Sequence, residues 1–522
     1  MAGLMTETTD RAATPRPSEP GRRKARRQGR PGLSPEWRKG LLIFAFVVLV
    51  GTGIFYAGRA LTTADPAQLQ IRVATPRGGV MPGERFTIEG SATESSDRPV
   101  YLERQVRGAW SRMETLQTTS AGAFVFSGLQ VDAPARLRVV LPEVSQLGQR
   151  HPAVTQVLPR VQVTKQAVPQ FSVLPGVVQN GAVPAEAGAA SLFAEATFSP
   201  IRPGREVYAQ RRLPGGDWER VGKDTQGAEG KVRFQVPQDA TTPYQYRVLA
   251  AGYKGAPEAA SPAQASNRWR LDFDDEFTYG VDSATWLTRG DVHAPDSSRT
   301  CARADSSMVS ASGDGAARLS AQRDPAYAPD SCSWKNPSTG ASGTESYYLN
   351  SHVGTQGTYS FRYGVAAARV KFQQPQGMHG AFWLQDSGEA GGTIGAEIDT
   401  VEFFGKGYAK GGIASFIYPS QGEEVGGTQP DASEALTGPR DNWWDRYHVF
   451  SVEWTPEAYV FRIDGVETLR VEENVADKKA FLIMSLLTSD WELKRMPEAG
   501  AGQMDVDWVR VWQDTRLNDQ NL

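Results

Sequence analysis

Three carboxylates lie close together in the second half of the chain. The stretch from Gly395 to Phe404 reads Gly-Ala-Glu-Ile-Asp-Thr-Val-Glu-Phe-Phe, with acids at Glu397, Asp399 and Glu402. Side chains alternate between the two faces of a strand, so Glu397 and Asp399 share a face and Glu402 points away. A one-residue bulge between Asp399 and Glu402 returns Glu402 to that face. The spacing therefore predicts a bulged strand with three acids on one surface.

Crowded carboxylates suit acid–base chemistry, because like charges keep one of them protonated near neutral pH. Retaining glycoside hydrolysis uses one carboxylate as nucleophile and another as acid/base, about 5–5.5 Å apart. Two other interpretations stay open on spacing alone: a calcium site, which also gathers carboxylate oxygens, and a solvated strand face. Apolar neighbours are typical of a packed strand and disfavour the solvated face; they are Ile398, Val401, Phe403 and Phe404.

The elements around these acids are predicted to be strands. From residue 68 onward, short runs of alternating apolar residues are broken about every 8–12 residues by Gly, Pro, Asp or Ser, which is typical of an all-β chain. The region after Trp269 is long for one small sandwich and suits a two-sheet β-jelly roll. We therefore expect all-β architecture, with the carboxylate strand inside a jelly roll.

An internal repeat precedes that region. The segment Val100–Arg104 (VYLER) recurs as Val207–Arg211 (VYAQR), and the flanking glycines, tryptophans and aromatic residues recur in the same order. Fixed-period similarity over roughly one immunoglobulin-sized sandwich indicates duplicated units. We predict two immunoglobulin-like β-sandwich modules, at 68–165 and 168–265. The matching tryptophans, Trp110 and Trp218, are expected to be core residues, with a platform for sugar rings as the alternative.

The N-terminal segment indicates export. Residues 41–58 carry no charge and are long enough to span a bilayer as a helix. Residues 1–40 are rich in Pro, Gly, Ser and Arg and are expected to be a disordered basic tail. The basic residues before the apolar run place the tail in the cytoplasm and the rest outside, so we expect a single-pass cell-membrane protein. A cleaved signal peptide and a secreted product are the alternative.

Charge and cysteine content narrow the partners. The chain has 56 Lys and Arg against 59 Asp and Glu, which does not indicate a nucleic-acid partner. Its two cysteines, Cys301 and Cys332, are too few for a metal cluster. Outside the cytoplasm they can pair, and a bridge over this loop would contribute roughly 3.5 kcal/mol on the chain-entropy description. Two buried free thiols are the other interpretation.

Several segments, in order, resemble glycoside hydrolase family 16 of the laminarinase and β-glucanase type. Besides the carboxylate strand they are Leu271–Phe277, Tyr363–Lys371, Gly377–Leu384, His448–Pro456 with Ile463–Gly465, and Met504–Trp512. The resemblance implies a concanavalin-like jelly roll over 268–514 and a retaining mechanism. It implies Glu397 as nucleophile, Glu402 as acid/base and Asp399 between them. It also implies no cofactor for catalysis, although a structural calcium is possible, and a β-linked glucan or galactan as substrate.

The resemblance also bears on binding residues. Trp383 resembles a tryptophan that stacks on a sugar ring, with core packing as its alternative. The family's Trp-Pro is replaced by His379-Gly380, where His379 either donates to a sugar hydroxyl or packs at a turn. Trp443, Trp444 and Trp491 lie in loop-like stretches and are further candidates for sugar contacts.

Three functions compete on this evidence. The first is an anchored endo-glycosidase that cuts a β-linked polysaccharide. The second is a cell-wall transglycosylase, in which a sugar hydroxyl rather than water resolves the intermediate. The third is a non-catalytic glycan-binding surface protein, which the intact set of three acids disfavours.

Overall fold

The computed structural model of the protein describes residues 62–93, 95–146, 148–187, 191–236, 243–295 and 297–518. The expected tail at 1–40 and membrane segment at 41–58 lie outside these residues. Within the described part of the chain, no helix is long and apolar enough to cross a membrane. That part is built almost wholly of strands, with one short α-helix, α2 (Thr515–Asn518). The all-β expectation is confirmed.

A small sheet forms a compact unit of its own, whose described residues lie within 62–67 and 142–154. Its three strands run in the order β1–β9–β8. They are β1 (Thr62–Thr63), β8 (Val144–Gln146) and β9 (Gln149–His151). The exposed pair Arg150–Glu143 lies in the same unit.

The rest of the repeat region forms two pairs of sheets. The first pair has the orders β2–β3–β6 and β10–β7–β4–β5, and the second has β11–β12–β15 and β14–β13–β16–β17, with β18 also paired to β16. Their bounds are β2 (Leu69–Ala74), β3 (Phe86–Ala92), β4 (Pro99–Val106), β5 (Ala109–Gln117), β6 (Ala123–Leu129), β7 (Leu137–Leu141), β10 (Val154–Val157), β11 (Gln170–Leu174), β12 (Leu192–Thr197), β13 (Glu206–Arg212), β14 (Glu219–Thr225), β15 (Lys231–Val236), β16 (Gln245–Ala250), β17 (Ala259–Ala260) and β18 (Gln264–Ala265).

The repeat falls on equivalent strands. Its first segments lie in β4 and β13, which occupy the same place in their sheets. In the second pair, both sheets contribute to one core, with Ala194 and Phe234 on one side and Val207 and Val248 on the other. The immunoglobulin-like assignment itself stays a prediction.

The expectation for the two repeated tryptophans was wrong. Neither Trp110 nor Trp218 is buried, and each indole has an arginine over its face. Arg138 lies 4.4 Å from the Trp110 ring centre and Arg247 lies 4.1 Å from that of Trp218. Cation–π contact of this kind explains why the pair recurs without entering the core. The two matching tryptophans therefore share a packing contact with arginine at the surface.

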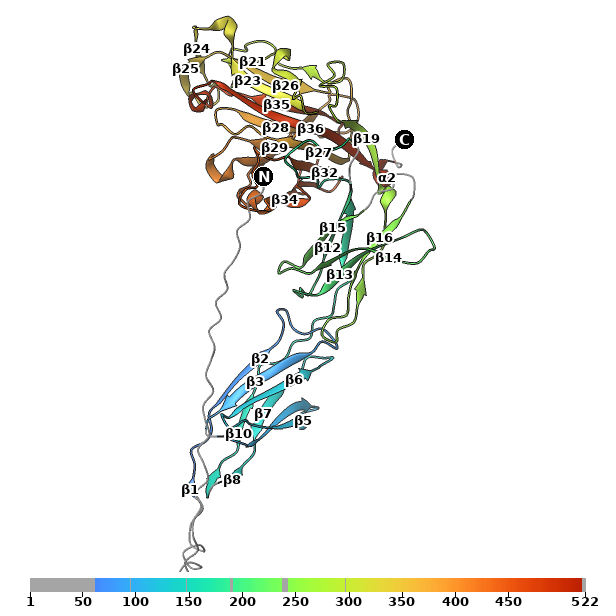
Figure 1. The fold of residues 1–522 in the computed structure, drawn as a ribbon, viewed down its shortest axis with the longest axis vertical. Helices are drawn as coiled ribbons and strands as arrows, with labels where there is room; N and C mark the ends of the chain where they lie inside the picture. The colour runs from blue at the N-terminus through green and yellow to red at the C-terminus, as the bar shows by residue number, and fades with distance from the viewer. Residues whose placement is uncertain are drawn as a thin grey trace, which may run out of the picture. The chain divides into compact units, whose positions relative to one another are not determined.

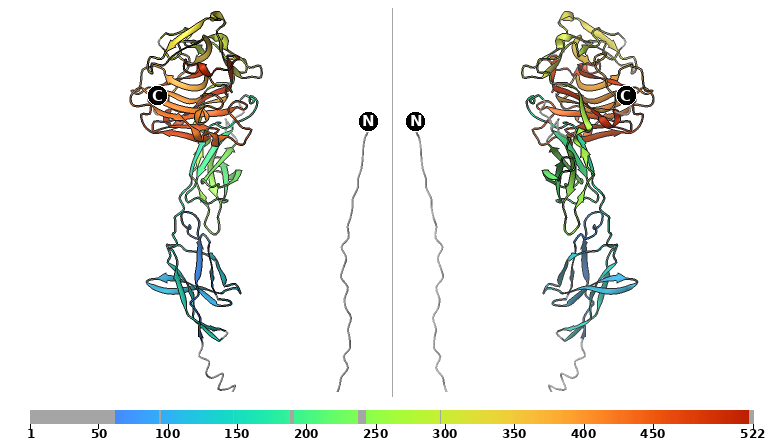
Figure 2. Two further views of the ribbon diagram at one scale, coloured as in Figure 1. Left: turned by 90° about the vertical axis from the view of Figure 1, so that its left-hand side faces the viewer. Right: turned by 90° about the vertical axis from the view of Figure 1, so that its right-hand side faces the viewer.

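The C-terminal strands form one jelly-roll-like, nearly closed sheet of 16 strands (Figure 1). Its path runs β31–β30–β29–β28–β35–β26–β23–β36–β27–β32–β33–β34, and β19, β20, β21 and β22 pair beside it. The first six strands of this path are called the front layer and the last five the back layer, with β23 joining them. Figure 2 shows these strands, coloured yellow to red, gathered in one body.

The bounds of these elements are as follows. They are β19 (Trp269–Asp275), β20 (Leu287–Thr288), β21 (Ala302–Ala304), β22 (Val309–Ala311), β23 (Ala317–Arg323), β26 (Tyr348–Gly354), β27 (Gly364–Lys371), β28 (His379–Asp386), β29 (Ala396–Phe403), β30 (Ile413–Pro419), β31 (Val425–Thr428), β32 (His448–Trp454), β33 (Tyr459–Ile463), β34 (Val466–Val471), β35 (Ala480–Leu487) and β36 (Ala501–Asp514). A separate hairpin joins β24 (Ser331–Lys335) to β25 (Ser342–Ser346), and six 3₁₀ turns are η1 (Ser266–Arg268), η2 (Ser306–Met308), η3 (Pro325–Tyr327), η4 (Ala409–Gly411), η5 (Pro430–Ala435) and η6 (Leu493–Arg495).

The main core lies between the two layers. Ile398 and Val401 of the front layer belong to the same buried cluster as Val452 and Val509 of the back layer. Alternation along each strand sends every second side chain into this core. The other face of the front layer is consequently free for polar residues.

The outer face of the back layer is also covered. Trp508 and Trp512 belong to a second buried cluster with Leu174 and Val177, which lie in or just after β11. The Trp269 indole N–H donates to the Val173 carbonyl at 2.7 Å. A fragment that begins at residue 268 would expose these tryptophans, so experiments on the C-terminal domain should keep the preceding module.

Candidate active site

Strand β29 carries the three acids on one face, and a bulge at Thr400 makes this possible. Asp399 pairs with Trp383 of β28, whereas Val401 pairs with the adjacent Phe382, so Thr400 is the extra residue. The register with β30 shifts at the same point. The Thr400 carbonyl accepts a hydrogen bond of 3.0 Å from the Ser415 hydroxyl, which satisfies a group that the interrupted ladder leaves unpaired.

The bulge sorts the side chains of β29 into two sets. Ala396, Ile398, Val401 and Phe403 lie in the core between the layers. Glu397, Asp399 and Glu402 therefore lie on the opposite side, which is called the carboxylate face from here on. Val401 shows the effect most clearly, because in a regular strand it would share a face with Glu397. The expected arrangement of the acids is thus present in the structure.

Neighbouring strands decide what surrounds each acid. Gln385, Trp383 and Ala381 of β28 stand directly opposite Glu397, Asp399 and Glu402 respectively. On the other side, Tyr418 and Phe416 of β30 pair with Glu397 and Asp399. Directly opposed side chains on one face are within contact distance. The residues paired with the acids across these two strands are therefore uncharged, and most are aromatic.

Burial and mutual repulsion perturb all three carboxylates. Burial raises the pKa of Glu397, and the charge of Glu402 raises it further. Burial raises the pKa of Asp399 well above its usual range, with additional contributions from Glu402 and Glu397. Burial also raises the pKa of Glu402, where Glu492 adds to the effect and His379 opposes it. A set of acids in this state can hold a proton near neutral pH, as a general acid must.

Two arginines favour the ionised form of Glu397. Arg299 and Arg289 both lower its pKa, against the effects of burial and of Glu402. Arg289 donates to the Gln385 side chain at 2.9 Å, which places its guanidinium next to the residue opposite Glu397. The side of the face that carries Glu397 is therefore suited to an ionised nucleophile.

Trp383 lies on the carboxylate face. It stands directly opposite Asp399, its indole N–H donates to the Ser485 hydroxyl at 3.1 Å, and its ring stacks on His352 at 5.7 Å between centres. The residue is only partly buried, so part of it is accessible to a planar apolar surface such as a sugar ring. The core-packing alternative does not describe this residue.

His379 is packed against charged residues and does not lie at a turn. It lies in β28 rather than at a turn, it is 4% exposed, and both ring nitrogens are engaged. Its Nδ1 is 2.6 Å from Glu492 Oε2 and its Nε2 is 3.4 Å from an Arg299 amino group. A sugar hydroxyl would have to displace one of these contacts. A role as donor to a sugar hydroxyl stays a prediction, and its partners Glu492 and Arg299 come from loops distant in sequence.

Residues 307–510 match the family model described as Glycosyl hydrolases family 16. A curated β-glucanase of Rhodothermus marinus is 26% identical over 185 residues, which are 32% of this chain and 63% of that protein. The match thus spans less than two thirds of the relative's length. Both findings support a glycosidase domain that acts on O-glycosyl bonds. The matched range contains the three acids but begins after Arg289 and Arg299.

Solved structures of similar proteins include the laminarinase catalytic domain of Thermotoga maritima MSB8. It is 21% identical, with 48% of this chain and 100% of that chain covered and a TM-score of 0.37. The endo-β-1,3-glucanase of Pyrococcus furiosus is 23% identical, with 47% of this chain and 94% of that chain covered and a TM-score of 0.35.

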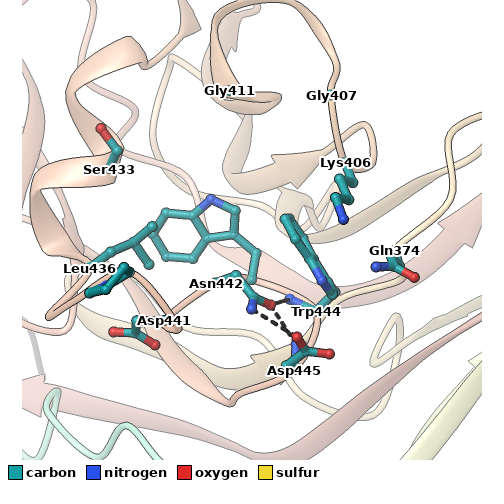
Figure 3. A pocket seen from close by; sticks show the side chains of 12 residues that line it. Gln374, Lys406, Gly407, Gly411, Ser433, Leu436, Asp441, Asn442, Trp444 and Asp445 are labelled. Carbon is teal, nitrogen blue, oxygen red and sulfur yellow. Dashed lines mark hydrogen bonds between the residues drawn. The ribbon is translucent and has the colours of Figure 1, made fainter.

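Two of the remaining tryptophan candidates lie on the core side of β29 rather than on the carboxylate face. Trp443 and Trp444 line a pocket together with Lys406, Asn442 and Asp445 (Figure 3). Trp443 is 5% exposed, and its ring packs against His448 and Phe450 within the main core. The loop before β32 turns this ring inward, and a role in sugar binding stays a prediction for Trp443. Trp444 is partly buried, with the Lys406 amino group 5.3 Å from its ring centre.

Trp491 lies beside the carboxylate face at the end that holds Glu402. Its ring is 6.3 Å from Phe404, which follows β29 directly and also lies 5.5 Å from the His379 ring. It is partly buried. A role in binding stays a prediction for Trp491.

The two cysteines are joined. Cys301 and Cys332 form a disulfide with their Cα atoms 5.6 Å apart, and both are buried. The bridge ties the loop that carries Arg299 to the β24–β25 hairpin. Among the described residues, no group of three or more His, Cys, Asp or Glu side chains is placed to hold a metal ion.

Sequence reasoning missed several residues of this site. Arg289, Arg299, His352 and Glu492 reach it from loops or from strands two or more positions away in the sheet, and nothing in their local sequence marks them. Tyr418 could have been predicted from the sequence, because it lies on the strand after the acids, at the position that pairs with Glu397.

Proposed function

We propose that the C-terminal domain hydrolyses internal linkages of a β-linked glucan by a retaining, double-displacement mechanism. The observation that carries this proposal is the bulge at Thr400, which sets three desolvated carboxylates on one face of β29. The family match over 307–510 and the β-glucanase relative support the reaction class and favour a glucan over a galactan.

In this mechanism Glu397 is the nucleophile. Its carboxylate attacks the anomeric carbon and forms a covalent glycosyl-enzyme, while the leaving sugar departs with a proton. Arg299 and Arg289 support this role, since both favour its ionised form. Gln385 opposite Glu397 is uncharged, and among the described residues no cation forms an ion pair with Glu397 that would weaken it as a nucleophile.

Glu402 is the acid/base. It is protonated when it delivers the proton to the leaving oxygen, and as a carboxylate it then activates the water that releases the product. Its strong desolvation and the nearby Glu492 support this role by favouring the protonated form. Asp399 lies between the two, and its own raised pKa lets it share a proton with either neighbour.

Trp383 is proposed to stack on the sugar ring next to the cleavage point, with Tyr418 on the other side of the acids. Trp383 faces the same side as Asp399, and Tyr418 pairs with Glu397 and is 39% exposed. Trp491 is proposed as a further contact near Glu402. The enzyme is proposed to act outside the cell membrane, held by residues 41–58.

The test uses the full-length protein with laminarin, lichenan, agarose, carrageenan and arabinogalactan, and follows reducing ends. We expect internal cleavage of the glucans, with a rapid fall in polymer length. Proton NMR of the first-formed product should show the β-anomer before mutarotation, and an α-anomer would refute retention. Binding without cleavage on every glycan would favour a non-catalytic surface protein.

Transglycosylation is the second candidate, and product analysis separates it from hydrolysis. Products longer than the supplied oligosaccharide would show that a sugar hydroxyl resolves the intermediate. Location is tested separately by membrane fractionation of cells that express the full chain. Release of a product that begins near Asp65 would show that the apolar segment is cleaved.

A further inference from the structure

Two loops meet beside the carboxylate face and are held together by Asp490. The backbone N–H groups of Thr300 and Cys301 each donate to the Asp490 carboxylate at 2.9 Å, and the Asp490 N–H donates to the Ser298 carbonyl at 2.9 Å. The disulfide at Cys301 adds a covalent restraint to the same loop. Arg299 therefore projects from a loop whose backbone is fixed on both sides.

The second loop carries Glu492, which fixes His379. Glu492 Oε2 lies 2.6 Å from His379 Nδ1 and also accepts the Ser489 N–H at 3.0 Å. The other ring nitrogen of His379 faces Arg299 at 3.4 Å. A guanidinium has only donors, so in the neutral ring Nε2 accepts from Arg299 and the Nδ1–H donates to Glu492. His379 thus links an anion to a cation through one imidazole.

These contacts do not engage every hydrogen-bond donor of the Arg299 guanidinium. Within the described chain it forms no ion pair with a carboxylate, and its Nε is buried without a hydrogen-bond partner. Its charge nevertheless lowers the pKa of all three acids, in each case against the larger effect of burial. A cation that acts on three carboxylates without pairing with one of them stays available to a substrate oxygen.

The other ionisable groups around this cluster do not duplicate Arg299. Arg289 lowers the pKa of Glu397, and Glu424, which directly precedes β31, raises the pKa of Asp399 and of Glu402. Burial lowers the pKa of His352 to about 3, with help from Arg289 and Arg299, so its ring is neutral at physiological pH. His379 stands diagonal to Glu402 across β28 and β29, which brings its ring and Glu492 closest to the acid/base candidate.

We propose that Arg299 is a further residue of the catalytic site, which balances the charge of the three carboxylates and contacts the substrate, and that His379 and Glu492 are positioning residues that hold it there. This inference rests on the proposed hydrolysis for its substrate contact. The positioning of the charge is independent of substrate. His379 and Glu492 lie on the side of the carboxylate face that holds Glu402. The protonation of the acid/base therefore depends on the two loops that carry Arg299 and Glu492.

The test compares Arg299→Gln with Arg299→Lys, and uses Arg270→Gln as the control because Arg270 pairs with Asp272 at the surface, outside this cluster. In Arg299→Gln, both limbs of the pH profile of kcat/KM should move to higher pH, by about one unit, because an opposite charge is removed from every acid. Arg299→Lys should keep most of the wild-type profile. His379→Leu should shift the profile in the same direction as Arg299→Gln. Glu492→Gln removes an anion that raises the pKa of Glu402, so its alkaline limb should instead move to lower pH.

A second readout does not need activity. Melting temperature is measured from pH 4 to 8 for the same variants. The raised pKa values mean that ionising the acids in the folded state lowers stability as pH rises, and losing Arg299 makes that loss steeper. The melting temperature of Arg299→Gln should therefore fall further below that of wild type as pH rises. The difference in melting temperature between Arg270→Gln and wild type should stay constant.

The outcomes are distinct. An unshifted pH profile, or a melting offset of Arg299→Gln that does not change with pH, would overturn the charge-balancing role. Equal behaviour of Arg299→Lys and Arg299→Gln would overturn it as well. A wild-type protein inactive on every glycan would refute the proposed hydrolysis alone, since the melting series would still decide the inference about Arg299.

Discussion

The carboxylate face and the pocket beside Trp444 are similar in composition but differ in the partners and the pKa shifts of their acids. Both combine tryptophans with buried carboxylates, and the pocket encloses about 540 Å³ (Figure 3). Asp441 in the pocket accepts the Thr437 N–H at 2.8 Å and its hydroxyl at 2.9 Å, and faces Arg446 and His448. Glu397 and Glu402 have no such tight partners within the described chain.

This difference separates a structural acid from a chemical one. Burial alone would raise the pKa of Asp441, but the hydrogen bonds from Thr437 and the charges of His448 and Arg446 lower it overall. At the carboxylate face burial prevails, and the pKa values are raised. A hollow with a tryptophan is therefore a weak sign of function, whereas desolvated acids without partners are a strong one.

The largest effect is expected for Glu397→Gln. Loss of the nucleophile should lower kcat/KM by a factor on the order of 10⁴ or more, measured by reducing ends on the preferred glucan. The same variant should be more stable than wild type above pH 4.5, because it removes an acid whose folded pKa is raised from 4.5, and equal to it at lower pH. Hydrolysis that survives this change would refute the assigned role.

The second-largest effect is expected for Glu402→Gln. We expect kcat/KM to fall by about 10²–10⁴, the contribution of a general acid, with loss of the alkaline limb of the pH profile. Substrates with a good leaving group, such as aryl glycosides, should lose less in the first step because they need little protonation. An unchanged alkaline limb would assign the acid to another group, with Asp399 the first candidate.

Trp443→Ala and Trp383→Ala form a matched pair of tryptophan truncations. Trp443→Ala should lower the free energy of unfolding by about 3–5 kcal/mol, because it empties a core site. Trp383→Ala should cost less stability and instead raise KM. Urea unfolding and kinetics on both variants check this. A raised KM with intact stability in Trp443→Ala would support its role in binding.

The smallest effect is expected for Asp441→Asn. Removal of the charge that faces Arg446 and His448 should cost about 1–3 kcal/mol of unfolding free energy at neutral pH without changing kcat. Because the folded pKa of Asp441 is lowered from 3.8, this cost should shrink as pH falls below 3.8. Glu397→Gln should show the opposite dependence, so unfolding of both variants across pH is the sharpest test of the comparison.

The sequence predicted the site through its spacing. Two acids two residues apart and a third three residues further on require a bulge if all are to share a face, and the structure has that bulge at Thr400. The strands and the internal repeat could also be predicted from the sequence, because alternation of apolar residues and turn residues act locally. The burial of the tryptophans could not be predicted, since it depends on what packs over each side chain in the folded chain. Trp443 turned inward and Trp110 and Trp218 turned outward for that reason.

What the sequence alone determined is therefore the chemistry at β29: which acids there are, and that they must meet on one face. It did so because strand geometry and the bulge act over a few residues. Only the tertiary structure decided what sets the charge of those acids. Arg299, His379 and Glu492 come from three separate segments, and their meeting depends on long-range strand pairing and on the Asp490 contact, which no local pattern encodes.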